Sequence, residues 1–155
     1  MTKLLLSIHV LAAILAIGPV AVAASLFPRY ARESPGTAAF LYRVCRGYTV
    51  VGVAVPAFGA ATGARMGVLG DAWLVTSIAL TTVAAILLVG AILPGQQRLL
   101  AATGTGADTG MDTGANTGVT RATAARLSMV TGVFNLLWAT VTVLMIVRPG
   151  STTGA

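Results

Sequence analysis

Charged residues are scarce in this chain. Only 9% of its 155 residues are charged, whereas 56% are hydrophobic, and a soluble domain usually carries about 25% charged residues. A soluble fold of this size could not cover its apolar surface with so few charges. The mean hydropathy of +0.88 points the same way. We therefore expect the lipid bilayer to be the solvent for most of the surface.

Residues that commonly carry out catalysis are also few. The chain has one cysteine (Cys45), one histidine (His9) and four acidic residues. A single cysteine cannot form a disulfide within the chain. The sequence contains no nucleophile–histidine–acid set, no phosphate-binding loop and no cysteine pair with metal-site spacing. These absences give no support to an enzymatic activity.

The excess of basic over acidic residues needs an explanation, because a net charge of +6 in a soluble protein suggests nucleic acid as a partner. Here the basic residues flank apolar segments, as membrane topology requires. No polar region interleaves aromatic and basic residues, so nucleic-acid binding is excluded as an interpretation. The single lysine against nine arginines, in a chain rich in alanine and glycine, is typical of a GC-rich bacterial genome.

Four apolar runs are long enough to cross a bilayer, which takes about 20 residues of helix. Proline or glycine follows shortly after several of them and predicts where they end. The sequence therefore predicts one all-α domain, an up-down bundle of four transmembrane helices. The predicted spans cover residues 4–27, 44–69, 72–93 and 125–147.

The first run has a second interpretation. Lys3, a leucine-rich stretch and Ala21-Val22-Ala23 are similar to a cleavable secretory signal. The apolar run is longer than the 7–15 residues that are usual for a signal core, and three later spans need a partner helix. We expect the first helix to be retained.

A four-residue repeat separates the last two spans, reading TGAD, TGMD, TGAN, TGVT from Thr105. The spacing of Asp108, Asp112 and Asn116 lacks the alternate ligand positions and the closing glutamate of a calcium loop. We interpret residues 103–120 as a flexible, low-complexity linker.

The basic residues predict the orientation in the membrane. Seven arginines lie in or beside the segments 28–43 and 94–124, and three basic residues lie on the opposite side. Positive residues accumulate on the cytoplasmic side. We expect both segments in the cytoplasm and both termini outside the plasma membrane.

Small residues mark where helices meet in lipid, because apolar attraction cannot hold them together there. Gly59, Gly63 and Gly67 form two overlapping GxxxG units on the second span. They predict association with another helix, in a homo-oligomer or with a partner membrane protein. Asn135, near the middle of the fourth span, is the predicted anchor for an interhelical hydrogen bond.

His9 is the candidate site residue, because an ionisable group within a span is a functional hypothesis by default. Arg65, Met66 and Met145 are predicted in the same outer half of the membrane. Three interpretations stay open. His9 binds haem or copper, with Arg65 as a cofactor contact and Met66 or Met145 as a second metal ligand; it handles a proton; or it only packs and forms a hydrogen bond.

The opening LLLSIHVLAAILAIGPVAVAASLFPRYARE, together with LLVGAILPGQQRLL and LMIVRPG, resembles the family of bacterial integral membrane proteins called domain of unknown function 2269. The opening is also similar to copper-resistance D proteins and haem-J-type protoporphyrinogen oxidases. In the latter, a histidine of the first helix is associated with haem, and the resemblance implies that role for His9. Those proteins have Trp-x-Gly-Gly where this chain has Ala16-Ile17-Gly18-Pro19.

Three functions are consistent with these patterns. The favoured one is a structural or accessory membrane protein that associates through its helices. The first alternative is a haem- or copper-binding protein that uses His9. The second is a small transporter, disfavoured because four spans enclose little volume and contain no deep acidic residue.

Overall fold

The computed structural model describes residues 2–65, 67, 70–109 and 114–147, and nearly all of them are helical. The helices are α1 (Thr2–Glu33), α2 (Pro35–Arg65), α3 (Ala72–Leu87), α4 (Leu93–Thr109) and α5 (Gly114–Val147), and the π-helical segment η1 (Leu88–Ile92) joins α3 to α4. The predicted all-α four-helix bundle is confirmed.

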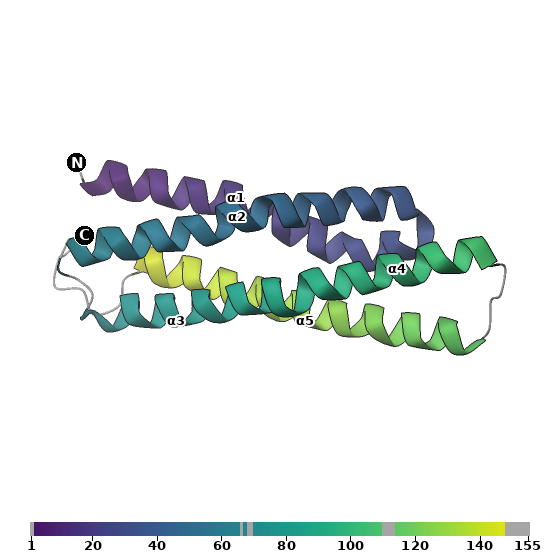
Figure 1. The fold of residues 1–155 in the computed structure, drawn as a ribbon. Helices are drawn as coiled ribbons and strands as arrows, with labels where there is room; N and C mark the ends of the chain where they lie inside the picture. Colours follow the sequence, from purple (N-terminus) through teal and green to yellow (C-terminus); the bar gives the residue numbers. More distant parts are fainter. Residues whose placement is uncertain (1, 66, 68–69, 110–113, 148–155) are drawn as a thin grey trace.

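Figure 1 shows four long rods side by side, because α3, η1 and α4 continue one another. Neighbouring rods are α1 and α2, α2 and α3–α4, α3–α4 and α5, and α5 and α1. Each rod contains a segment long and apolar enough to cross a membrane, over residues 11–33, 35–61, 72–103 and 120–147. The chain is a multi-pass membrane protein.

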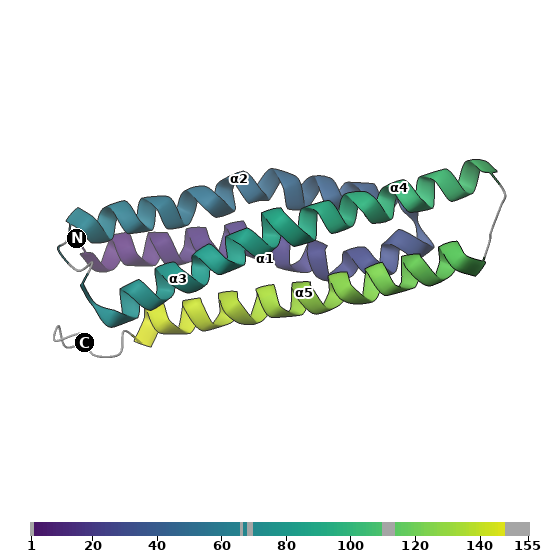
Figure 2. The same ribbon diagram turned by 60° about the horizontal axis from the view of Figure 1, so that its bottom comes forward.

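The two ends of the bundle differ in charge. We call the end with Arg29, Arg32, Arg98 and Arg121 the arginine end, and the end where α1 begins and α5 finishes the histidine end (Figure 2). The turn between α2 and α3 lies at the histidine end. Gly67, with a φ of 71°, forms part of this turn and suits the left-handed conformation that often follows a helix.

The helices continue past the ends predicted from hydropathy. The segment 28–43 was expected to be a loop, but α1 runs through Pro28 to Glu33, and Ser34 alone separates it from α2. The Ser34 carbonyl accepts a bond from the Ala38 amide, and proline at the first helical position suits the start of α2. Because Ala31 and Ala38 are buried, packing extends both helices beyond the apolar spans.

Pro94 was expected to end the third span, and this prediction is wrong. In a regular α-helix the proline ring would clash with the carbonyl four residues earlier. The wider π-helical turn η1 directly precedes Pro94 and explains how the rod continues. Beyond it, Gln96 and Leu99 are buried, and the absent side chain of Gly95 leaves room for Leu127, whose Cδ1 lies 3.1 Å from an ideal Cβ position.

The Thr-Gly repeat was expected to be a loop, yet α4 extends to Thr109 and α5 starts at Gly114. Threonine and glycine have low helix propensity. Extending an existing helix avoids the cost of nucleation, however, and both helices are already anchored by their spans. The repeat outside 110–113 is therefore helical.

Among the side chains that the structure describes, the core lies in the middle of the bundle and toward the arginine end. Its largest fully buried apolar side chains there are Phe27 of α1, Ile92 of η1, Leu99 of α4 and Phe134 of α5. Phe134 also meets Trp138 edge to face, with ring centroids 6.4 Å apart. Side chains of α1, η1, α4 and α5 thus contribute to one packed cluster.

Candidate functional site

His9 lies half-buried on α1 and faces α2. An ideal Cβ built on Gly59 would stand 3.1 Å from the His9 Cε1 and 3.6 Å from its Nε2. Any side chain at position 59 would therefore press on the ring. Glycine on α2 is what lets the imidazole pack against the backbone of the neighbouring helix.

The same face of α2 continues toward the middle of the bundle. Gly52 accommodates Ile17, whose Cδ1 lies 3.3 Å from the ideal Cβ position, and Gly63 is buried on the histidine side of Gly59. The glycine face was expected to associate with another helix. The helix that it meets at Gly52 and Gly59 is α1 of the same chain. Gly67 does not belong to the face, because it lies in the turn after α2.

Of the other predicted site residues, the structure describes the side chain of Met145 alone. Met145 is half-buried on α5, whereas Met66 and the side chain of Arg65 lie outside the described residues. Two hydroxyls of the same half, Thr76 and Ser77, donate to the carbonyls of Ala72 and Trp73 in their own helix. Their hydrogens are therefore not directed at His9.

The ring nitrogens of His9 have no hydrogen-bond partner in the part of the chain that the structure describes. The same residues contain no group of three histidine, cysteine or acidic side chains that could hold a metal. His9 therefore packs against a neighbouring helix, as the interpretation of a purely structural histidine expects. The hydrogen bond that this interpretation also expects is absent among the described residues. The observations fit neither haem nor copper specifically, and no chemical step follows from either group.

Asn135 fulfils its predicted role as an interhelical anchor. Its Nδ2 donates to the Ser25 Oγ at 3.1 Å and joins α5 to α1, while Ser25 donates to the carbonyl of Ala21. The Asn135 Oδ1 is buried without a partner, as is the Nε1 of Trp138 one turn further along α5. This junction holds two helices together but leaves some of its polar atoms unsatisfied.

A buried contact around Cys45 was missed by the sequence analysis. The thiol is fully buried and donates weakly to the Val20 carbonyl at 3.9 Å, while the Gln96 Nε2 donates to the Cys45 Sγ at 3.5 Å. Three helices meet at this point. The signal available was helical spacing, since Ala38, Leu41 and Cys45 lie on one face of α2. A thiol enclosed in this way is a packing residue and not an accessible nucleophile.

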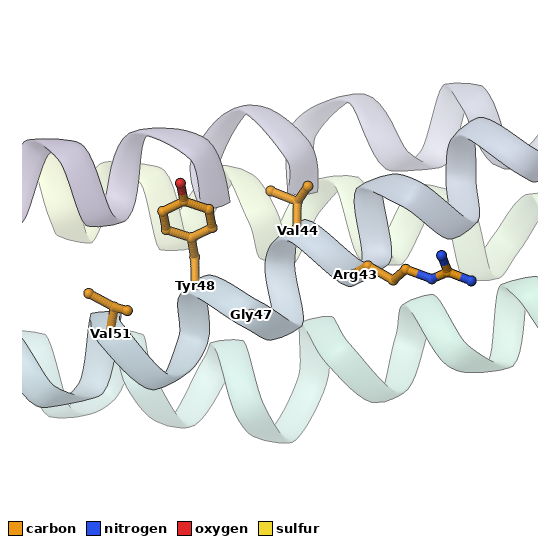
Figure 3. Close-up of a pocket in the computed structure, with 5 residues that line it drawn as sticks. All are labelled: Arg43, Val44, Gly47, Tyr48 and Val51. Atoms are coloured by element: carbon orange, nitrogen blue, oxygen red, sulfur yellow. The ribbon is translucent and has the colours of Figure 1, made fainter.

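Two hollows lie on the outside of the bundle. One, of about 300 Å³, lies over Gly47 on the outer face of α2. Figure 3 shows Val44, Tyr48 and Val51 projecting from the helix around it, while Arg43 extends along the helix. The other, of about 450 Å³, lies between α1 and α5 at the arginine end. His9 lines neither hollow.

Comparison with known proteins does not assign the chain to a family. No family model, no curated protein and no solved structure matches it.

Proposed function

We propose that this chain is an accessory protein of a bacterial plasma membrane that acts by lateral association of its helices and not by catalysis. The observation that carries the proposal is the uncovered outer face of α2. Within the bundle, 12% of an 18-residue apolar window of α2 is buried, compared with 17% for α5, 28% for the rod of α3 and α4, and 39% for α1. One whole side of α2 is thus left to lipid or to another helix.

The outer face of α2 has the composition of a helix contact. Gly47, Ala54, Ala57 and Ala61 follow one another at spacings of seven, three and four residues, so they share a side of the helix. Gly47, Ala57 and Ala61 are exposed and Ala54 is half-exposed. Small side chains let a second helix approach closely in lipid, where van der Waals packing holds helices together.

The partner that we propose is a second copy of the chain. The same small-residue surface on both copies can pair about a two-fold axis, which is the commonest symmetry of oligomers. The hollow over Gly47 would accept a side chain of the opposing α2. The glycine face is already used by α1 at Gly52 and Gly59, which leaves the outer face for this contact.

Cysteine cross-linking in lipid vesicles tests the proposal. In a Cys45→Ala background, Ala61→Cys on α2 and Ala139→Cys on α5 each carry one thiol at an exposed alanine position. We expect an oxidant to form dimers through position 61 and few through position 139. Equal cross-linking at the two positions would reflect random collisions and contradict the proposal.

The orientation is proposed from charge. We place the arginine end in the cytoplasm and both termini outside, because basic residues are retained on the cytoplasmic side. Membership of the domain of unknown function 2269 family likewise remains a prediction. Labelling of single cysteines with a membrane-impermeant reagent in intact cells tests the orientation, since only thiols at the histidine end should react.

The alternative function, haem or copper binding at His9, is supported by one observation, the absence of a hydrogen bond to its ring nitrogens among the described residues. A visible absorption spectrum of the purified protein beside that of His9→Ala tests it after supplementation with haem or copper. A colourless, metal-free preparation would exclude it. The second alternative, a small transporter, gains no support from hollows that lie on the outside of the bundle.

A further inference from the structure

The groove between α1 and α5 at the arginine end combines positive charge with open space. Its volume is about 450 Å³. It is lined by Pro28, Arg29, Arg32 and Glu33 of α1 and by Arg121, Ala124, Ala125 and Ser128 of α5. The small side chains of α5 keep its floor open between the arginines.

The charges of the groove are only partly compensated. The Arg29 Nε lies 3.2 Å from the Glu33 Oε1, and this ion pair is exposed. Arg32 and Arg121 have no acidic partner in the described part of the chain. Three arginines against one glutamate leave the lining with a net charge of +2. The planar guanidinium group suits phosphate oxygens, to which it can donate two parallel hydrogen bonds.

The groove lies at the depth of the lipid headgroups. Arg29, Arg32 and Glu33 follow the apolar run of α1, and Arg121 precedes the apolar run of α5. Charged side chains at the ends of apolar runs reach the headgroups. One or two turns deeper, the exposed side chains of Val22 and Leu26 on α1 and of Met129 on α5 offer apolar surface. An acyl chain can lie along this surface while its headgroup occupies the groove.

Space for a chain continues beside the groove on α5. A Cβ built on Gly132, one turn deeper than Ser128, would meet nothing within 4 Å. Charge at the membrane edge and uncovered apolar surface below it are the two parts of a phospholipid site. A free phosphate ion would use the first part only.

We propose that this groove binds an anionic phospholipid, with Arg32 and Arg121 as the ligands of its phosphate group. The site is independent of lateral association, because it lies on α1 and α5 and not on the outer face of α2. The proposal predicts that one anionic phospholipid binds at one position. A general attraction between arginines and a negatively charged membrane would show no such preferred position.

Native mass spectrometry of the full chain in detergent measures this directly. The probes are phosphatidylglycerol and phosphatidylcholine with identical acyl chains. The test variant is Arg32→Gln/Arg121→Gln, and the matched control is Arg46→Gln/Arg98→Gln, which removes the same charge from exposed positions at the same end. We expect phosphatidylglycerol to bind roughly 30-fold more weakly to the test variant and within about 2-fold of the original affinity to the control.

A charge-neutral variant separates binding from folding. Ala125→Leu fills the floor of the groove at an exposed position, and we expect it to weaken phosphatidylglycerol binding while the helical circular dichroism stays unchanged. Three results would overturn the proposal: equal losses in the test and control variants, unchanged binding to Ala125→Leu, or full displacement of the lipid by inorganic phosphate at equal concentration. The last result would identify a site for free phosphate.

Discussion

The two halves of this bundle are held together in different ways. In the middle of the bundle and toward the arginine end, large side chains such as Phe27, Ile92 and Phe134 are fully buried. Toward the histidine end, α1 and α2 meet where a glycine receives a ring, at Gly59 and His9. The first region is fixed by filled volume, whereas at the contact in the second a side-chain ring rests on the backbone of a glycine. In lipid, where burial from water gives no attraction between helices, these are two distinct sources of stability.

Both halves also enclose polar groups. The packed half encloses Gln96, whose Oε1 is buried without a partner although its Nε2 reaches the Cys45 Sγ. The surrounding large side chains must supply enough packing to offset that cost. In the histidine half, the buried Ser77 hydroxyl is satisfied by its own helix, through the Trp73 carbonyl, whereas the Trp138 Nε1 is buried without a partner.

Removal of a large side chain from the packed half should have the largest effect. We expect Phe134→Ala to lower the free energy of unfolding by about 2–3 kcal/mol. This is less than the usual 3–5 kcal/mol, because lipid solvates the ring of the unfolded chain and mainly the cavity cost remains. Denaturant titration in detergent micelles measures the change. A loss no larger than that of His9→Ala would remove the distinction between the halves.

A substitution in the histidine half should act through one contact. We expect Gly59→Leu to cost about 1–2 kcal/mol, because its side chain collides with the imidazole. In the Gly59→Leu/His9→Ala double variant most of this loss should disappear, giving a coupling energy of about 1 kcal/mol.

Gly132→Leu is the matched control for that cycle, since nothing lies within 4 Å of its Cβ position. The same change should cost little there and show no coupling with His9→Ala. Additive effects of Gly59→Leu and His9→Ala would mean that the ring does not rest on Gly59.

The junction between α1 and α5 should give the smallest effect. Asn135 and Ser25 share one hydrogen bond of 3.1 Å, and such bonds in membrane proteins contribute about 0.6 kcal/mol on average. A double-mutant cycle with Asn135→Leu and Ser25→Ala, followed by thermal unfolding, should return a coupling of this size. A coupling near zero would indicate that Asn135 only fills space.

The spans and the interhelical role of Asn135 could be predicted from the sequence because hydropathy and helical spacing are local properties. The ends of the helices could not. Pro28 and Pro94 are reasonable stop signals, but α1 continues through one and η1 accommodates the other. Packing of residues beyond those prolines, such as Ala31 and Leu99, overrides the local signal.

The pairing of side chains across helices was also beyond the sequence. The predicted spans place Cys45 at the start of the second span and Gln96 beyond the end of the third. Only the continuation of the rod past Pro94 brings Gln96 to within 3.5 Å of the Cys45 thiol. In the same way, the spacing of the glycines predicted that this face of α2 contacts a helix. It could not show that the helix in contact at Gly52 and Gly59 is α1 of the same chain.

Fluorescence energy transfer between labelled copies in lipid vesicles tests lateral association through the outer face of α2 most directly. Dilution with lipid should leave efficient transfer for the original chain. We expect Ala57→Leu/Ala61→Leu to weaken association roughly tenfold by separating the helices, whereas Ala139→Leu on the exposed face of α5 should leave it unchanged. Equal transfer in all three proteins, or transfer that lipid dilution abolishes in the original chain, would contradict the account.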